Sequence, residues 1–349
     1  LQGLKSGEPM RRDTIFRIAS MTKSVTAAAA MILVEETVLR LDDPVDPWLP
    51  ELANAKVLRQ IDSAVDDTVP ARRPITLRDL LAFTCGMGLV FAPPGTYPIQ
   101  KAIEKAGFMP GPNSLQVTPD EYMKRLSALP LIDQPGEQWR YHTGSDVLGV
   151  LIARAAGVRF DVFLQERIFA PLGMTDTGFY VPEAKLDRLA TGYGYDDAGK
   201  LVIVDEARGR FAKPPLFPSG GAGLVSTADD YLAFARMLLR GGEGVLSRAA
   251  VELMMTDALT PAQKAASQFT PGFFDNQSWA FGGSVITRRT GIATTPGQYG
   301  WVGGHGTLFS VDRREDMITV FLSQRAMRHP WDIPIGQDFQ TLAYRALAD

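Results

Sequence analysis

The stretch Phe16-Arg17-Ile18-Ala19-Ser20-Met21-Thr22-Lys23 marks the point where a short apolar run passes into the strongest helical pattern in the first third of the chain. From Ser20 to about Glu36, apolar positions recur with the 3.6-residue spacing of a helix, and Ser20 stands where an N-cap or first-turn residue belongs. Ser20 and Lys23 are three positions apart, so their side chains share one helical face and lie within reach of each other.

A serine and a lysine in this arrangement can form a nucleophile and its base. The helix N-terminus supplies backbone N–H groups and positive potential where an oxyanion would form. Lysine acts as a base when burial or neighbouring cations lower its pKa, and the apolar helix around Lys23 could provide that burial. The spacing alone does not decide the matter, because a helix-capping Ser20 beside a solvated Lys23 fits it equally well.

Composition limits the class of protein. The 349 residues are 45% hydrophobic and 21% charged, which is typical of a globular protein with a sizeable core. A net charge of −3 gives no overall electrostatic preference for nucleic acid or an anionic membrane surface. The longest apolar run, Val25 to Val34, is about half of the ~20 residues that a membrane span needs. We therefore expect a small-molecule partner, no nucleic acid and no membrane, and the sequence also allows a homodimer.

Cysteine and histidine are too scarce for a disulfide framework or for a zinc site built on thiolates. Cys85 is the single cysteine, and the histidines His142, His305 and His329 form no HExxH arrangement. We therefore do not expect a zinc hydrolase. The first residues, from Leu1, show no charged-then-apolar leader, and we expect a cytoplasmic location.

The pattern along the chain predicts two regions of different architecture. Residues 41–180 read as a mainly helical domain with short helices (77–83, 119–126 and 146–156) and a structureless loop or lid from Phe91 to Thr118. Residues 1–40 and 181–349 read as one discontinuous α/β domain, and the active site would lie in the cleft between the two domains. Four runs predict an antiparallel meander, followed by a final helix: Ser278–Ile286, Tyr299–Val302, Thr307–Val311, Met317–Ser323, and the helix Ile335–Leu347.

Two later segments carry groups that a reactive serine would need. The usual serine-hydrolase elbow, GxSxG with a later Asp and His, is absent. Tyr141-His142-Thr143 instead lies in a loop before a capped helix, where the Tyr141 phenol can point into a cleft. Trp301-Val302-Gly303-Gly304-His305-Gly306 lies between two strand runs, where glycines permit close approach of a substrate to the strand edge. Ser145-Asp146-Val147 resembles a Ser-Asp-Asn motif, but it lacks the Asn and falls in the helix start.

The serine β-lactamase and penicillin-binding-protein superfamily carries three motifs in this order: Ser-x-x-Lys, then Tyr-x-(Asn/Ser/Thr), then a strand triad ending in Gly. This chain resembles the family VIII carboxylesterases, which are relatives of class C β-lactamases. Similar segments run from about Ile15 to Gln324, among them Leu41-Asp42-Asp43-Pro44-Val45 and the stretch from Gly221 to Asp230. The resemblance implies an α/β (α+β) fold, in which an antiparallel sheet flanked by helices adjoins a mainly helical lobe.

Carried over to this sequence, the resemblance implies that Ser20 is the acylated nucleophile, Lys23 its base and Tyr141 the proton relay to the leaving group. The oxyanion hole would consist of the backbone N–H groups of Ser20 and Gly304. Substrate contacts are expected from four residues: Trp301, Gly303, Thr143 and His305. Aromatic side chains that could line an acyl pocket, or simply pack the lobes, are Phe91, Tyr97, Phe269, Phe273, Phe274 and Trp279. No metal or organic cofactor is implied.

The chain departs from the family pattern at three places. Trp301 stands where the β-lactamases and peptidases of this fold carry Lys or His, so the cation that meets a substrate carboxylate is missing and neutral esters are favoured. Thr143 stands where many relatives have Asn, which removes one amide contact to the acyl side chain. The 19 residues ahead of Ser20 cannot hold the helix and two strands that the family places there, so we expect these strands to be absent from the sheet.

The sequence therefore predicts a serine carboxylesterase that cleaves short-chain esters through a Ser20 acyl-enzyme. The nearest alternative is a β-lactamase, D-amino peptidase or amide hydrolase on the same site, which would require a cation from His305, Arg288 or Arg289. An acyltransferase that passes the acyl group to an alcohol or amine is a second alternative. A sensor that is acylated once and never turned over is a third, although all three predicted catalytic residues are present.

Overall fold

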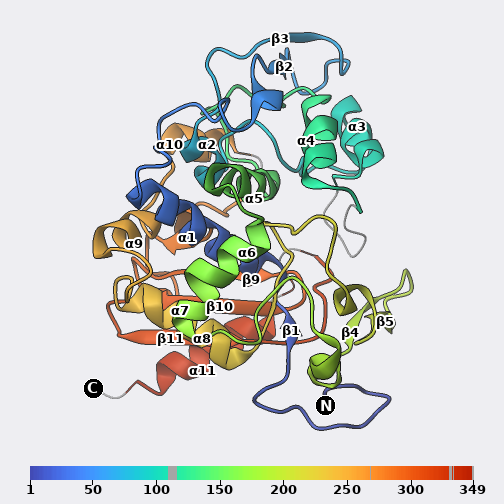
Figure 1. The fold of residues 1–349 in the computed structure, drawn as a ribbon, viewed down its shortest axis with the longest axis vertical. Coiled ribbons are helices and arrows are strands. Elements are labelled where there is room, and N and C mark those ends of the chain that lie inside the picture. Colours follow the sequence, from blue (N-terminus) through green and yellow to red (C-terminus); the bar gives the residue numbers. More distant parts are fainter. Residues whose placement is uncertain (109–115, 268, 330–331, 333, 348–349) are drawn as a thin grey trace.

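A five-stranded antiparallel sheet forms the centre of the structure, a computed structural model that describes residues 1–108, 116–267, 269–329, 332 and 334–347 (Figure 1). The strands lie in the order β11-β10-β9-β8-β7. Their bounds are Gln277–Trp279 (β7), Ser284–Ile286 (β8), Tyr299–Gly303 (β9), Thr307–Asp312 (β10) and Met317–Phe321 (β11). Strands consecutive in sequence pair with each other, so the predicted antiparallel meander is confirmed.

The run Ser278–Ile286 was predicted as one strand, and this is wrong because the chain reverses within it. Gly282 has φ +75°, which favours glycine, and a Cβ there would come within 2.5 Å of the carbonyl oxygen of Lys23. The N–H of Ala280 donates to the carbonyl of Gly283 at 2.8 Å and closes the turn. The result is the β7–β8 hairpin, which packs closely against the helix that starts at Thr22.

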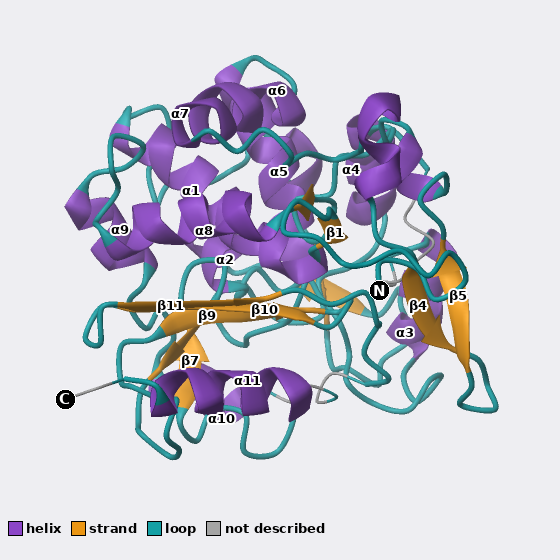
Figure 2. Ribbon diagram, turned by 90° about the horizontal axis from the view of Figure 1, so that it is seen from below, coloured by secondary structure: helices purple, strands orange, loops and turns teal. Residues whose placement is uncertain are grey.

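Helices cover both faces of the sheet, which Figure 2 shows nearly edge-on. On one face, α8 (Ala228–Leu239) packs against β10 and β11, and α11 (Pro334–Arg345) packs against β11 from the other. The C-terminal helix predicted from the sequence is thus confirmed. The Tyr231 hydroxyl of α8 donates to the carbonyl of Met21 at 2.8 Å, which ties α8 to the chain just ahead of the first long helix.

That first long helix, α1 (Thr22–Glu35), is the centre of the hydrophobic core. Twelve consecutive residues, from Thr22 to Leu33, are buried, so α1 is enclosed on all sides. Such a helix needs partners all round, and it packs against α5 (Thr143–Ala156) on one side and α9 (Arg248–Met254) on another. A short 3-10 turn, Ala19–Met21, precedes α1 and carries Ser20.

Residues 41–180 are mainly helical, with one small hairpin. The hairpin pairs β2 (Lys56–Leu58) with β3 (Thr68–Pro70). The remaining helices of the chain are α2 (Leu77–Ala82), α3 (Pro98–Ala106), α4 (Pro119–Ser127), α6 (Phe160–Leu164), α7 (Ala170–Leu172) and α10 (Pro261–Ala266). Side chains of Thr76 and Thr118 accept backbone N–H groups at the starts of α2 and α4, as the sequence indicates.

Within the predicted loop from Phe91 to Thr118, the structure places a helix, so that prediction is wrong over α3. Pro98 stands at the first helical position, and the N–H of Tyr97 donates to the side chain of Gln100 at 2.9 Å. The part of this segment from 109 to 115 lies outside the described residues.

The predicted division into two domains stays a prediction, because one continuous hydrophobic core reaches into both. Two further strand pairs lie outside the central sheet: β1 (Phe16–Arg17) with β6 (Val225–Ser226), and β4 (Gly192–Tyr195) with β5 (Leu201–Asp205). In the described part of the chain, no strand from residues 1–40 joins the central sheet. None of the described helices has both the length and the apolar character of a membrane-crossing segment.

The closeness of β9 and β10 generates a prediction about stability. A Cβ on Gly300 would lie 2.2 Å from the carbonyl oxygen of Phe309, which belongs to the rigid sheet backbone. We expect Gly300→Ala to lower the free energy of unfolding by about 3 kcal/mol, measured by urea denaturation. Gly304→Ala is the matched control, because a Cβ there has nothing within 4 Å, and its unfolding free energy should change by less than about 0.5 kcal/mol. Equal losses in the two variants would contradict this account.

Candidate active site

The amine of Lys23 is the most deeply buried charged group of the candidate site. Lys23 is 0% exposed, and its Nζ lies 3.0 Å from Oγ of Ser20, 2.5 Å from the carbonyl oxygen of Gly221 and 3.2 Å from Nδ1 of His142. Burial lowers the pKa of Lys23 to about 7, and the negative charge of Asp146 opposes this only in part. A substantial fraction of Lys23 is therefore neutral near pH 7 and able to take a proton from Ser20.

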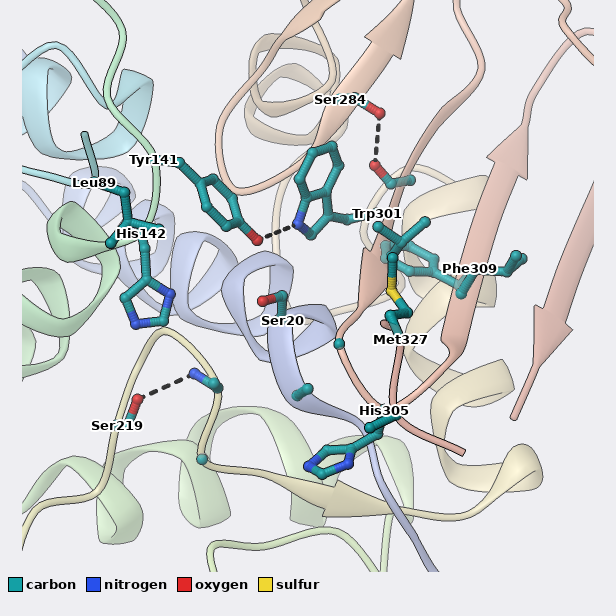
Figure 3. A pocket seen from close by; sticks show the side chains of 18 of the residues that line it. Ser20, Leu89, Tyr141, His142, Ser219, Ser284, Trp301, His305, Phe309 and Met327 are labelled. Atoms are coloured by element: carbon teal, nitrogen blue, oxygen red, sulfur yellow. Dashed lines mark hydrogen bonds between the residues drawn. The ribbon is translucent and has the colours of Figure 1, made fainter. Parts of the chain in front are cut away.

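Ser20 is the middle residue of the 3-10 turn, is half-buried, and lines a large cavity (Figure 3). Gly304 follows β9 and lines the same cavity, with its carbonyl fixed by the N–H of Met327 at 2.9 Å. The backbone N–H groups of Ser20 and Gly304 donate to none of the described residues. Two free N–H groups that face the cavity of a candidate nucleophile are what an oxyanion hole requires.

Tyr141 is held between Ser20 and Trp301. The indole N–H of Trp301 donates to the Tyr141 hydroxyl at 2.7 Å (Figure 3), and Nζ of Lys23 lies 4.7 Å from the centre of the Tyr141 ring. Burial raises the pKa of Tyr141 to about 12, while hydrogen bonds with Ser20 and Trp301 act in the opposite direction. The sequence predicts that the family's cation is missing at the position of Trp301. In the structure, Trp301 supplies a neutral hydrogen-bond donor at this position instead.

The sequence analysis missed two residues of this site, His142 and Asp146. Nε2 of His142 lies 3.4 Å from Oδ2 of Asp146, and Oδ1 of Asp146 accepts the hydroxyl of Ser219 at 2.6 Å and the N–H of Gly221 at 2.9 Å. Their spacing of four positions at a helix start is the signal that could have found them. Asp146 was instead set aside as part of an incomplete Ser-Asp-Asn motif.

The ionisation of this pair follows from burial and contact. Burial, and then the nearby charge of Lys23, lower the pKa of His142, although Asp146 acts the other way. Burial alone would raise the pKa of Asp146, but its contacts with His142, Ser219 and Gly221 outweigh that and lower it. Near pH 7 the pair is therefore a neutral imidazole beside a carboxylate.

The cavity is large and mostly apolar at the end that holds Tyr141 and Trp301. The hollow as a whole has a volume of about 1470 Å³, but it extends to Gln340 and Thr341 of α11, so only part of this volume lies beside Ser20. The rings of Phe91, Phe269 and Phe273 line it beside Tyr141 and Trp301, as the sequence indicated for an acyl pocket. Among the cations that line it are Arg208, Arg210, Lys213 and Arg328, which come from the segments after β5 and β11.

Two predicted substrate contacts lie away from this cavity. Thr143 is the first residue of α5 and is buried, and His142 lines the cavity in its place. Gly303 is a packing residue, because a Cβ there would come within 2.2 Å of Oγ1 of Thr307 and 2.4 Å of the carbonyl of Ile18. Thr143 and Gly303 are therefore not among the residues that line the cavity, whereas Trp301 is, and substrate contact by any of them stays a prediction.

His305 lines the cavity, but it does not supply a cation. Burial, together with the charges of Arg17 and Arg210, lowers its pKa to about 4, so it is neutral at pH 7. Arg288 and Arg289 do not line the cavity: Arg288 donates to the carbonyl of Asp275 and Arg289 pairs with Glu315. In the described part of the chain, no group of three or more His, Cys, Asp or Glu side chains is arranged to hold a metal ion.

Comparison with known proteins agrees with this geometry. The family described as Beta-lactamase matches residues 1–333. Protein Rv1367c of Mycobacterium tuberculosis is 41% identical over 330 residues, which cover 92% of this chain and 80% of that protein. Esterase EstB of Burkholderia gladioli is 32% identical over 349 residues, which cover 93% of this chain and 82% of EstB. Among solved structures, EstCE1, "a hydrolase with promiscuous acyltransferase activity", has a TM-score of 0.78 and 26% identity, covering 97% of this chain and 87% of EstCE1.

The chain therefore belongs to the beta-lactamase family. The resemblance to the serine β-lactamase and penicillin-binding-protein superfamily is confirmed, and so is the mixed fold with an antiparallel sheet flanked by helices. Within this superfamily of serine hydrolases, its relatives include an esterase and a hydrolase with acyltransferase activity.

The buried amine predicts a pH dependence of stability. The pKa of Lys23 is lowered from 10.5 to about 7 in the folded protein, so above pH 7 the unfolded chain binds a proton that the folded chain does not. The free energy of unfolding should therefore rise with pH through this residue, by about 2 kcal/mol between about pH 7 and pH 9, and Lys23 adds no slope at lower pH, where both states bind the proton. Urea denaturation of wild type and Lys23→Met at the two pH values measures the difference. Equal pH slopes would contradict the lowered pKa.

Proposed function

We propose that the protein is a carboxylesterase that cleaves short-chain esters through an acyl-enzyme on Ser20. The observation that carries the proposal is the fully buried amine of Lys23, 3.0 Å from Oγ of Ser20, with a pKa of about 7. An amine that is partly neutral at working pH and within hydrogen-bond reach of a hydroxyl is suited to general base catalysis.

Acylation begins when Oγ of Ser20 attacks the ester carbonyl carbon and Nζ of Lys23 takes the hydroxyl proton. The N–H groups of Ser20 and Gly304 stabilise the oxyanion. As the bond to the alcohol oxygen breaks, Tyr141 gives its proton to that oxygen, and the protonated Lys23 restores the proton to Tyr141. The indole N–H of Trp301 stabilises the transient phenolate through its 2.7 Å hydrogen bond. A water molecule then attacks the acyl carbon and regenerates Ser20 by the same proton transfers.

The surroundings of Tyr141 support a neutral, apolar acyl group. Trp301 offers an N–H and a ring but no charge, and His305 is neutral because its pKa is about 4. The ring centroid of Phe269 lies 5.9 Å from that of Tyr141, and the ring centroid of Phe273 lies 6.3 Å from that of Trp301. A short apolar acyl chain fits against such rings, whereas a substrate carboxylate would find no cation on β9.

Acyl transfer to an alcohol is the second candidate function. From Ser20 the cavity continues toward the segment after β5, where Arg208 and Lys213 line it, which leaves space for a second substrate next to the acyl group. The similarity to EstCE1, a hydrolase with promiscuous acyltransferase activity, also favours it. Water and alcohol would then compete for the same acyl-enzyme.

Steady-state turnover of p-nitrophenyl butyrate and of a chromogenic cephalosporin tests the proposal. We expect ester hydrolysis with little cephalosporin cleavage, and we expect Ser20→Ala and Lys23→Ala each to lower kcat by about 10⁴-fold or more. Ser24→Ala is the matched control, because this serine lies next to Lys23 on α1 but donates to the carbonyl of Gly282. Full ester turnover in Ser20→Ala would exclude the mechanism, and faster cephalosporin cleavage would favour a β-lactamase.

Replacement of Trp301 by Phe tests the neutral donor. The change keeps an aromatic ring on β9 but removes the N–H that donates to Tyr141. The phenolate loses one hydrogen bond, so we expect kcat for p-nitrophenyl butyrate to fall roughly 10-fold with a smaller change in KM. An unchanged kcat would mean that Tyr141 does not develop negative charge during the reaction.

A further inference from the structure

The amine of Lys23 has three polar neighbours, and their chemistry fixes how its hydrogens must point. A neutral amine carries two N–H bonds and one lone pair. The carbonyl of Gly221, 2.5 Å away, can only accept, so one N–H goes there. If Lys23 is to take the proton of Ser20, the lone pair must face Oγ, 3.0 Å away. The second N–H must then go to Nδ1 of His142 at 3.2 Å, and Nδ1 must be an acceptor.

Asp146 sets which nitrogen of His142 accepts. A carboxylate only accepts hydrogen bonds, and Oδ2 of Asp146 lies 3.4 Å from Nε2 of His142, so Nε2 carries the hydrogen and Nδ1 is left free to accept. In the other tautomer, Nδ1–H would donate to the lone pair of Lys23 and occupy the site that must receive the proton of Ser20.

We propose that His142 and Asp146 are positioning residues, which hold the Lys23 amine with its lone pair directed at Ser20. The inference rests on the proposed function and deepens it. His142 touches the amine and acts through it, and Asp146 acts through His142. Neither residue is needed to receive the proton of Ser20.

Groups from two other parts of the chain fix the carboxylate of Asp146. Oδ1 of Asp146 accepts the hydroxyl of Ser219 at 2.6 Å and the N–H of Gly221 at 2.9 Å, both from the segment ahead of β6. The hydroxyl of Tyr122, on α4, is also hydrogen-bonded with Asp146, and Asp146 itself belongs to α5. Because Gly221 contacts both the carboxylate of Asp146 and the amine of Lys23, the segment ahead of β6 fixes these two groups relative to each other.

The backbone of His142 is itself strained. His142 has φ +88° and ψ −64°, in a region that side chains other than glycine rarely adopt, and it stands as the N-cap of α5 without a side-chain cap. Such a conformation persists only where the surroundings impose it, and it gathers at functional sites. Here it places the imidazole between Lys23 and Asp146 while Tyr141, one position earlier, faces Ser20.

Among the described residues, the titratable groups that contact this imidazole are Lys23 from α1 and Asp146 from α5. The ring of Tyr141 lies beside it, with the ring centroids 6.0 Å apart, and Tyr122 is linked to it through Asp146. Lys23 and His142 repel each other when both are charged. Near neutral pH, therefore, at most one of the two is protonated and positively charged near the carboxylate of Asp146.

His142→Gly separates a positioning role from a structural one. Glycine adopts φ +88° without strain, so the thermal midpoint should stay at or above that of wild type although the imidazole is lost. With the lone pair of Lys23 no longer oriented, kcat/KM for p-nitrophenyl butyrate should fall roughly 10- to 100-fold, mainly through kcat. Added imidazole should restore part of kcat, because His142 lines the cavity. Wild-type kcat/KM in this variant would overturn the inference.

Asp146→Asn gives an independent signature in the pH profile. The amide can donate to Nε2 and so favours the wrong tautomer, and the plateau of kcat/KM should fall roughly 10-fold or more. The variant also removes the negative charge that raises the pKa of Lys23, so the acid limb should move to lower pH. Asp230→Asn is the matched control, since this buried carboxylate on α8 contacts Thr177 and the N–H of Asp176, and its profile should match wild type. A wild-type plateau or an unmoved acid limb in Asp146→Asn would overturn the inference.

The two proposals fail in different ways. A wild-type protein with no Ser20-dependent turnover, and with no labelling of Ser20 by a fluorophosphonate, would overturn the proposed function and this inference with it. Wild-type turnover that persists in full in His142→Gly and Asp146→Asn would overturn the inference alone.

Discussion

The removal of one amine from water is the constraint on which the rest of this structure depends. Lys23 belongs to α1, a helix that is apolar on nearly every side and therefore has to be enclosed. The sheet, α5 and α9 enclose it, and in doing so they bury the amine with the helix. Burial is unfavourable for the charged form of lysine, so the packing that stabilises the fold also lowers the pKa of Lys23. The same packing around α1 therefore forms the hydrophobic core and lowers the pKa of Lys23.

The end of the cavity that holds Tyr141 and Trp301 has no cation on β9, whereas the family pattern places one on the corresponding strand. Trp301 replaces that cation with an indole N–H, and His305 is uncharged. The buried Asp146 is the anion that balances the proton of Lys23. At this end of the cavity, shape and apolar contact outweigh charge pairing, and the cations that line the cavity come from the segments after β5 and β11.

Much of the fold and the first residues of the site could be predicted from sequence because they follow from local rules. The spacing of Ser20 and Lys23 places them on one face, and alternating residues predict the meander. The hairpin at Gly282 also had a signal, two adjacent glycines inside a strand-like run, that was passed over. The family resemblance supplied the roles of Ser20, Lys23 and Tyr141, which spacing alone could not.

The rest of the site could not be read from residue patterns. The positive φ of His142 is a backbone state that no propensity predicts for histidine. The carbonyl of Gly221 contributes through its backbone, so residue type says nothing of it. That the indole of Trp301 would donate to Tyr141 depends on two segments 160 positions apart. These contacts exist only after tertiary packing.

This dependence on packing has a consequence for the newly made chain. The partners of the Lys23 amine come from residues near positions 20, 142 and 221, so they meet only when much of the chain has been synthesised and folded. Before then Lys23 is solvated and charged, and Ser20 has no base beside it. In the proposed mechanism, folding itself is therefore the activation step, and a nascent or misfolded molecule would carry an unreactive Ser20.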